Sequence, residues 1–514
     1  MSLSRRQFLL GGASALVLAA CSGNDDDAAP ASTSTTTEPV RVPTTEPAAT
    51  PLAAAPFLAG IASGDPDPES VVLWTRLLGA EGEHPVVWEV AEDESFASLV
   101  AAGVATATPE DAHTVHVVAD GLADDTWYWY RFTAGEHVSP VGRTRTTPKA
   151  GADAERLRFA FASCQDWQDG HYSAHEHLAA EDVDLVVFLG DYIYEGGPST
   201  SSPRSHDGPE VITVDDYRGR YALYKSDPNL QAAHARAPWL TIWDDHEVDN
   251  DHAGMAQDDG APPGVDFTAR RTAAYRGWWE HNPTRLPKPM GNALEIHRSL
   301  EWGALATFFA LDGRQHRTDQ PCGGSLAASC VEREDPAGTM LGAEQEAWIA
   351  DALPGSATTW NVVANQTVMA PSPIELGPAT LFNMDQWDGY PAAQRRMLEV
   401  LAESTNPVVI TGDIHASAVG DIRLDGAVVA TELVGTSLSS EFPSDLAPFF
   451  ETAAVGAGAL MADATHRGYV VCELTPTTFR ADYRIVESVL VPQSPVSTSS
   501  SWEITAGTPG VTKA

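Results

Sequence analysis

The sequence predicts an α/β domain that follows an N-terminal β-sandwich, and two patterns along the chain carry this prediction. Residues 56–150 hold short runs of alternating polar and apolar residues separated by turn residues, which is typical of sandwich strands. Over residues 157–490, nearly continuous apolar segments alternate with helical stretches, which is typical of buried strands in an α/β sheet. A chain of 514 residues is long enough for two or three domains with large cores.

The first residues predict the compartment. The segment SRRQFL at 4–9 is a twin-arginine pattern, and an apolar run over 13–20 follows it. Because this run ends in LAAC, we expect a lipoprotein signal over 1–20 and a lipid on Cys21, the alternative being a plain secretory signal. Residues 21–55 are rich in Ser, Thr and Pro and predict a flexible tether. We therefore expect an exported protein, anchored at the outer face of the membrane or released to the cell wall or periplasm.

In the N-terminal domain the expected strands are 71–76, 85–90, 113–118 and 127–132. This domain resembles a fibronectin type III-like module. It holds no cluster of metal-ligating residues, so we expect it to play a structural role or to flank the substrate.

The α/β domain is expected to contain strands at 157–163, 183–189, 238–243, 360–364 and 408–411. Helices are expected at 171–181, 215–225 and 391–403. The last residues, 491–514, are rich in Ser, Thr and Gly and predict a flexible tail.

Cysteine usage agrees with export. Cys322 and Cys330 enclose a loop of small residues, and we expect them to form a disulfide in an oxidising compartment. Cys472 lies in an apolar strand and is expected to be a small buried side chain.

The charge excludes one class of partner. The chain has 31 Lys and Arg against 71 Asp and Glu, a net charge of −40. A nucleic-acid-binding protein would carry a basic patch, so this class is excluded. An anionic substrate must meet local cations, and bound metal ions can supply them.

Polar residues of metal-binding type follow five of the expected strands. They are 164–166, 190–195, 244–251, 365–366 and 412–415. Ligands of open α/β sheets bind at the carboxyl ends of the strands. We expect all five strand ends to lie at the same edge of the sheet, which predicts a metal site there.

The residue types indicate the metals. Tyr194 as a phenolate and Cys164 as a thiolate need a strongly Lewis-acidic ion, and Fe³⁺ fits. The hard oxygen donors suit Ca²⁺, Mg²⁺ or Mn²⁺, and they are Asp191, Asp244, Asp245, Asn250 and Asp413. Two neighbouring ions can clamp a phosphate and activate a water molecule, so no covalent nucleophile is required.

At this point the motifs resemble a family. FASCQ at 161–165, GDYIYE at 190–195, WDDHEVDND at 243–251, NQ at 365–366 and GDIHAS at 412–417 look like the PhoD-type alkaline phosphatases, relatives of the purple acid phosphatases. The resemblance implies a calcineurin-like αββα metallophosphoesterase core that binds one Fe³⁺ and one or two Ca²⁺.

The resemblance also implies roles for residues. Asp191 would bridge two metals, Tyr194 would bind Fe³⁺, and Cys164 would stand where purple acid phosphatases have an Asp. The full expected ligand set is Cys164, Asp191, Tyr194, Asp244, Asp245, Asn250, Asn365, Asp413 and His415. We expect His246, Asp191 and Asn250 to be catalytic, with His246 donating to the phosphate or leaving alkoxide, or else orienting a carboxylate.

Arg270 and Arg271 are expected on the exposed face of a helix rather than at the phosphate.

The expected function is an exported, metal-dependent phosphoesterase that hydrolyses phosphate mono- or diesters with a metal-activated water. Phospholipase D activity on phospholipid head groups is the main alternative. A non-catalytic lipoprotein that binds cell wall is the other. We expect a monomer whose partners are the substrate ester and a cell-wall or membrane-surface polymer.

Overall fold

The structure is a computed structural model that describes residues 40–45, 52, 55–200, 202–257, 262–324 and 326–514. The predicted signal over 1–20, the lipid site at Cys21 and most of the tether over 21–55 lie outside the described residues. Within the described residues, no helix is long and apolar enough to cross a membrane.

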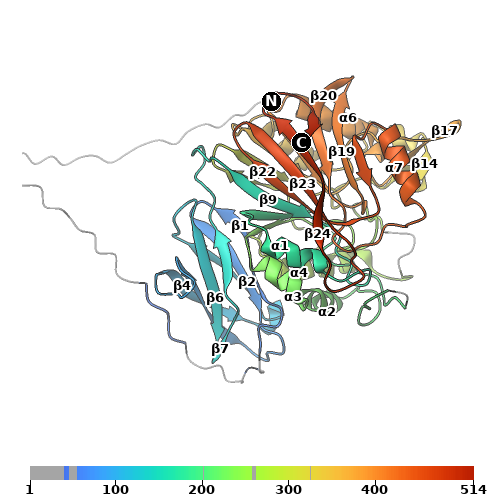
Figure 1. Cartoon of the computed structure of the whole chain (residues 1–514). Helices are drawn as coiled ribbons and strands as arrows, with labels where there is room; N and C mark the ends of the chain where they lie inside the picture. Colours follow the sequence, from blue (N-terminus) through green and yellow to red (C-terminus); the bar gives the residue numbers. More distant parts are fainter. Residues whose placement is uncertain (1–39, 46–51, 53–54, 201, 258–261, 325) are drawn as a thin grey trace, which may run out of the picture. The chain divides into compact units, whose positions relative to one another are not determined.

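Two sheets face each other in the N-terminal sandwich (Figure 1). One sheet contains β1 (Ile61–Asp67), β2 (Ser70–Arg76) and β5 (Thr114–Asp120). The other contains β3 (His84–Ala91), β4 (Leu99–Ala107), β6 (Trp127–Ala134), β7 (His137–Val138) and β8 (Gly142–Arg145). The four strands predicted in this region are present, because alternate residues such as Val71, Leu73 and Tyr130 are buried between the sheets.

The α/β domain is built on two large sheets, the first of which continues through β11 (Trp239–Thr241) into β1, β2 and β5 of the sandwich as one ten-stranded sheet. In the first, β9 (Leu157–Ala162), β10 (Leu185–Phe188) and β11 are parallel. Antiparallel strands extend it beyond β9, namely β22 (Arg467–Leu474), β23 (Thr478–Val486), β24 (Val496–Thr505) and β25 (Val511–Lys513).

In the second sheet, β13 (Ala306–Ala310), β15 (Trp360–Ala364), β18 (Pro407–Thr411) and β20 (Ala427–Val434) are parallel. The antiparallel strands β12 (Arg298–Trp302), β19 (Ser417–Leu424) and β21 (Met461–Asp463) complete it. A small separate sheet contains β14 (Leu326–Ala328), β16 (Ile374–Leu376) and β17 (Ala379–Asn383).

The two large sheets of the α/β domain pack face to face. The rings of Phe159 in β9 and Phe308 in β13 meet edge to face with centroids 5.0 Å apart. Val408 and Ile410 of β18 belong to this inner core, whereas Val409 between them packs on the opposite face. Residues at alternate positions therefore point to the two faces, and both faces are buried, which is why these strands are almost wholly apolar.

Helices cover the outer faces of both sheets (Figure 1). Those against the first sheet are α1 (Ser173–Ala180), α2 (Val214–Lys225), α3 (Pro228–His234) and α4 (Phe267–His281). Those against the second are α5 (Gly342–Ala352) and α6 (Pro391–Ala402), while α7 (Ala447–Gly456) contacts β21. The three predicted helices correspond to α1, α2 and α6, so the layers follow the predicted order αββα.

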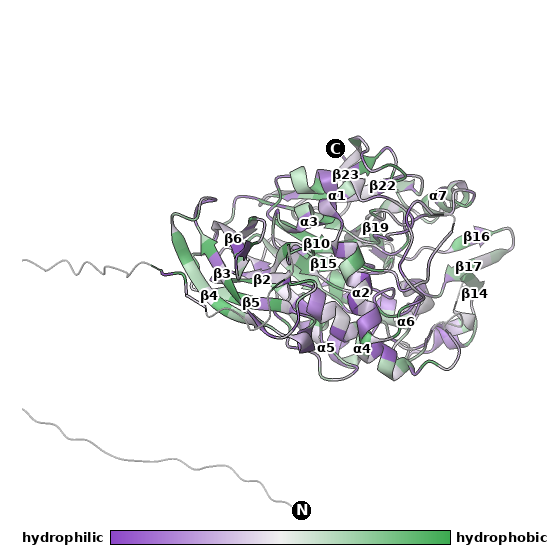
Figure 2. Ribbon diagram, turned by 90° about the horizontal axis from the view of Figure 1, so that it is seen from below, coloured by the Kyte–Doolittle hydropathy of each residue, from purple (hydrophilic) through white to green (hydrophobic). Residues whose placement is uncertain are grey.

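Local capping explains where two of these helices begin. Thr213 and Asp216 form a capping box at the start of α2, and Asp266 accepts hydrogen bonds from the first turn of α4. Hydropathy follows the layers, since apolar segments concentrate in the strands and polar ones on the outer helix faces (Figure 2).

The sandwich is joined firmly to the α/β domain. A single residue pair, Gly64 with Trp239, links β1 to β11. Trp74 of β2 is buried and donates its indole N–H to the Glu280 carbonyl at 2.8 Å. His116 of β5 stacks on Trp279 with ring centroids 4.6 Å apart. These contacts place the sandwich at the β11 edge of the first sheet, as part of the scaffold.

The prediction for the C-terminal segment is wrong. Residues 491–514 are not a flexible tail, because β24 pairs with β23 from Val496 to Thr505 and β25 pairs with β24. Backbone hydrogen bonds hold these Ser- and Thr-rich residues, and burial of Trp502 and Ile504 anchors one face. The Ser- and Thr-rich composition hid the alternation of buried and exposed residues near the end of β24.

The cysteine predictions are confirmed. Cys322 and Cys330 form a disulfide. Cys472 is fully buried in β22 and carries no disulfide.

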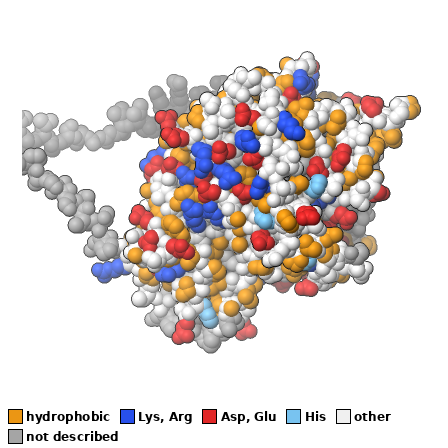
Figure 3. All heavy atoms as spheres, in the orientation of Figure 1, with side chains coloured by type: hydrophobic (Ala, Val, Ile, Leu, Met, Phe, Trp, Pro, Cys, Tyr) orange, Lys and Arg blue, Asp and Glu red, His pale blue; other side chains and the backbone are white. Residues whose placement is uncertain are grey.

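Acidic side chains are spread over the surface, and on the face shown in Figure 3 the Lys and Arg side chains gather in one part of it, among Asp and Glu. Ion pairs such as Arg145–Asp184 and Arg158–Glu181 occur within the described residues.

Candidate metal centre

The five predicted strand ends converge, but they do not lie at one edge of a single sheet. β9, β10 and β11 belong to the first sheet, whereas β15 and β18 belong to the second. Face-to-face packing brings the carboxyl ends of the two sheets together, and a bridge between Ser163 and Ser437 joins the loops there. The site therefore lies between the sheets, which a count of strands along the sequence could not predict.

Two glycines allow the loops to approach closely. Gly190 has φ +108°, and a Cβ on it would lie 2.5 Å from both the Cβ and the backbone N of Asp244. A Cβ on Gly412 would lie 2.5 Å from the Ser163 hydroxyl oxygen. Packing therefore requires glycine at positions 190 and 412, directly before Asp191 and Asp413.

Backbone strain is concentrated at the site. Residues other than glycine with positive φ include Cys164 (56°), Asp191 (57°), Asp251 (51°), Asp413 (65°) and His415 (53°). Such conformations cost about 1–3 kcal/mol each and persist where the surrounding structure enforces them, most often at functional sites.

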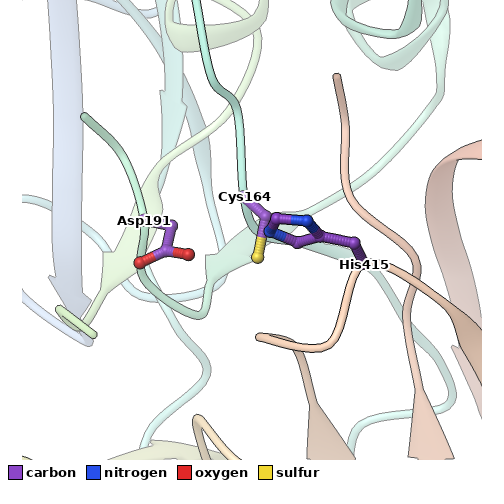
Figure 4. A group of neighbouring side chains, drawn as sticks. All are labelled: Cys164, Asp191 and His415. Carbon is purple, nitrogen blue, oxygen red and sulfur yellow. The ribbon is translucent and has the colours of Figure 1, made fainter. Parts of the chain in front are cut away.

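A first group of potential ligands comes from three loops. Ligand atoms of Cys164, Asp191 and His415 lie within 4.8 Å of one another, and Figure 4 shows the three side chains around one space. The Tyr194 hydroxyl joins them, 3.0 Å from Asp191 Oδ2 and 3.0 Å from His415 Nε2. The group thus combines a thiol, a phenol, an imidazole and a carboxyl.

Burial makes this group unsuited to holding negative charge by itself. It raises the pKa of the Cys164 thiol well above its usual range, and Asp191 raises it further. It likewise raises the pKa of Asp191 and of Tyr194. A bound cation would reverse these shifts, because it stabilises the deprotonated ligands.

A second group consists of carboxylates alone. Ligand oxygens of Asp244, Asp245 and Asp413 lie within 4.8 Å of one another. Burial raises the pKa of Asp413 to about 6, and that of neighbouring Asp251 to about 8.

Two buried oxygens in the two groups have neither a hydrogen bond nor an ion pair among the described residues. They are Asp191 Oδ1 and Asp244 Oδ2, whereas Asp245 Oδ1 has no hydrogen bond but lies 3.4 Å from Arg314 Nη2. Buried polar atoms without partners are rare in native proteins, and buried carboxylate oxygens without a donor fit metal ions. The residues present therefore fit a centre with more than one cation.

His246 lies between the two groups. Its Nδ1 is 2.7 Å from Glu195 Oε2, and its ring lies over Tyr194 with centroids 4.1 Å apart. A ring nitrogen of His246 is within 4.8 Å of carboxylate oxygens of Asp191 and Asp245. Nδ1 is thus engaged with Glu195, whereas Nε2 has no hydrogen bond among the described residues.

Arg314 is a residue of the site that sequence reasoning missed. It follows β13, a strand that was not predicted, and its side chain has no exposed surface. The guanidinium contacts four carboxylates, which belong to Asp244, Asp245, Asp385 and Asp413. The signal available was an apolar strand, ATFFA, followed by LDGR, which repeats the pattern of a polar residue after a buried strand.

One predicted ligand has its side chain engaged elsewhere. Asn365 donates to the Thr367 carbonyl, and its side-chain oxygen accepts from Trp387 Nε1 at 3.3 Å, so its amide stabilises the loop after β15. Asn250 is half-buried, and its backbone N–H donates to Glu195 at 2.9 Å; its role as a ligand stays a prediction.

Arg270 and Arg271 are buried, contrary to the prediction. Arg270 pairs with Glu210 at 2.8 Å and Asp249 at 3.0 Å, while Arg271 donates to the Gly254 carbonyl at 2.6 Å. The loop after β11 folds over α4 and covers the face that the helical pattern marked as exposed.

Comparisons with known proteins agree with this geometry. Residues 159–483 match the family model of the PhoD-like phosphatase, and residues 44–148 match the model of its N-terminal domain. The chain belongs to the PhoD-like phosphatase family. It is 41% identical over 477 residues to alkaline phosphatase D of Bacillus subtilis (strain 168), which covers 88% of this chain and 82% of the relative.

A solved structure of PhoD superposes with a TM-score of 0.86 at 39% identity, covering 90% of this chain and 93% of that one. The predicted family, fold class and enzyme class are therefore confirmed: the chain is a phosphatase, and its substrates are phosphate esters. A purely non-catalytic role is excluded by this similarity.

Proposed function

We propose that this phosphatase is an exported phosphoesterase that uses Fe³⁺ and Ca²⁺. In this proposal Cys164, Asp191, Tyr194 and His415 hold Fe³⁺, while Asp244, Asp245 and Asp413 hold Ca²⁺. The observation that carries it is the pairing of two ligand groups of different chemistry, with buried carboxylate oxygens between them that lack partners.

The donor types support this division of metals. Thiolate and phenolate donors favour a strongly Lewis-acidic ion, whereas a set of carboxylates alone favours a hard cation such as Ca²⁺. Asp191 has one oxygen near Tyr194 and the other without a partner, so it is suited to bridge the two metals.

When bound, the ions would lower the pKa of a water molecule and offset charge on the phosphate. His246 has a separate role as a proton donor. Because Nδ1–H donates a hydrogen bond to Glu195, a protonated His246 ring has Nε2–H left to donate to a phosphate oxygen or the leaving alkoxide. The Tyr194 ring beneath the imidazole keeps it in this orientation.

Export is part of the proposal and rests on the twin-arginine pattern and LAAC at the N-terminus. The disulfide Cys322–Cys330 supports an oxidising compartment. A lipid on Cys21 would keep the enzyme at the membrane surface, where phosphate mono- and diesters of the cell envelope are available.

The test uses purified protein with p-nitrophenyl phosphate and bis-p-nitrophenyl phosphate, each before and after chelation of Ca²⁺, beside a metal analysis. We expect iron in the protein and turnover that chelation abolishes and Ca²⁺ restores. The ratio of the two rates distinguishes a monoesterase from a diesterase. Turnover that survives chelation, in protein without iron, would refute the proposed metals.

A pair of variants separates the iron site from general damage. Cys164→Ser should lose iron and nearly all turnover. Cys472→Ser is the matched control, because that cysteine is equally buried but lies in β22 outside both ligand groups. It should keep its iron.

A further inference from the structure

A buried arginine lies among the carboxylates that we assign to Ca²⁺. Each guanidinium nitrogen of Arg314 contacts a different aspartate. Nε pairs with Asp244, Nη1 with Asp385 at 2.7 Å, and Nη2 with Asp413 at 3.1 Å. Nη2 also lies 3.4 Å from Asp245. All three carboxylates of the second ligand group therefore share one fixed positive charge.

The surrounding residues hold this guanidinium in place. The Arg314 backbone N–H donates to Asp312 at 3.1 Å. Asp385, which accepts from Nη1, also accepts from Arg317 at 3.0 Å and from Gln320 at 2.8 Å. Both the backbone and the far end of the side chain are therefore anchored among these carboxylates.

The contacts of the arginine leave one oxygen of Asp244 without a hydrogen bond. Arg314 uses Oδ1 of Asp244, whereas Oδ2 of Asp244 is buried without a partner. One oxygen of this ligand is thus occupied by the resident cation and the other remains available.

We propose that Arg314 is a permanent cation of the metal centre. It balances the charge of Asp244, Asp245 and Asp413, keeps them assembled in the absence of Ca²⁺, and limits how tightly Ca²⁺ binds. This inference rests on the proposed Ca²⁺ site. Its consequence is that Ca²⁺ exchanges with the medium rather than remaining permanently bound.

The charge of Arg314 should change the affinity for Ca²⁺ in a definite direction. Even with the dielectric constant of water, about 80, repulsion between a divalent ion and a guanidinium about 5 Å away corresponds to a change of about tenfold in Kd. Removing the guanidinium should therefore tighten Ca²⁺ binding. If Arg314 only positioned the ligands, removing it would weaken binding instead.

The experiment titrates Ca²⁺ into the full chain by calorimetry after dialysis against a chelator, and records the thermal midpoint with and without Ca²⁺. For Arg314→Met we expect a lower midpoint without Ca²⁺, a larger increase on adding it, and a Kd about tenfold lower than that of the wild type. Arg270→Met is the matched control, because Arg270 is equally buried but its ion pairs are with Glu210 and Asp249, outside the ligand group. Its Kd should change by less than about threefold.

Two further variants keep the test decisive if the methionine variant does not fold. Arg314→Lys retains the charge and should bind Ca²⁺ like the wild type. Arg314→Gln retains hydrogen bonding without charge and should bind more tightly. A neutral variant that binds Ca²⁺ equally or more weakly than the wild type would overturn the inference. A wild type that binds no Ca²⁺ would overturn the proposed function itself.

Discussion

Substituting Gly190 by alanine tests whether the close approach of two loops builds the candidate metal centre. The new Cβ would lie 2.5 Å from the Cβ and backbone N of Asp244 and 2.8 Å from the carbonyl carbon of Trp243. These are mostly backbone atoms of the segment after β11 and cannot rotate away, so that segment must shift by about 1 Å to reach ordinary contact. The shift moves Asp244 directly.

The expected loss of free energy of unfolding in Gly190→Ala has two parts. Overpacking against backbone costs about 1–3 kcal/mol, and placing a Cβ at φ +108° adds about 1–3 kcal/mol. The sum is about 2–6 kcal/mol. At about 2.1 cal/mol/K per residue, unfolding the described chain carries an entropy of about 1 kcal/mol/K, so the thermal midpoint should fall by about 2–6 °C. A ligand misplaced by about 1 Å should reduce kcat/KM by up to about 100-fold.

Gly219→Ala is the matched control. Gly219 lies inside α2, a Cβ on it would meet no atom within 4 Å, and its φ is ordinary for a helix. The same substitution there should raise stability by about 0.5–1 kcal/mol and leave the rate unchanged. Differential scanning calorimetry and hydrolysis of p-nitrophenyl phosphate measure both effects. A Gly190→Ala protein with the wild-type midpoint and rate would refute the reasoning.

Three other predictions follow from single contacts. Glu195→Gln removes the ionic partner of His246, so kcat should fall about tenfold with KM little changed; an equal change in KM would indicate a binding role. Replacing Cys322 and Cys330 by serine opens a loop with a sequence separation of 8 and should lower the free energy of unfolding by about 2.5 kcal/mol in a chemical denaturation series. Burial lowers the pKa of His175 to about 3, so the unfolded chain takes up the proton first, and stability should decrease as pH falls from about 6.5 toward 3. His175→Asn should reduce this slope by up to about 1.4 kcal/mol per pH unit, and an unchanged slope would contradict it.

Local signals in the sequence were sufficient for most elements of the fold. The strands that end at 162, 188 and 411 are apolar on both faces, and α2 and α6 follow helical periodicity. Burial on both faces makes such strands conspicuous without any knowledge of their neighbours. The residues after them, from Cys164 to His415, could be named because each follows a strand directly.

Other features depended on contacts between distant segments. Residues 491–514 have the composition of a tail, and they form strands only because β23 offers a free edge. Arg270 lies in an unremarkable helical sequence, and the carboxylates that bury it come from Glu210 and Asp249.

The candidate metal centre shows the same division. The sequence by itself determined which residue types follow the strands, and hence the resemblance to phosphatases that act on phosphate esters, because these signals are local and short. Only the tertiary structure decided that two sheets contribute to one site, that Asn365 turns away from it, and that Arg314 enters it. The physical reason is that charge balance in a buried site is a property of all groups within a few ångströms, and Arg314 and Asp385 are separated by 71 positions in the chain.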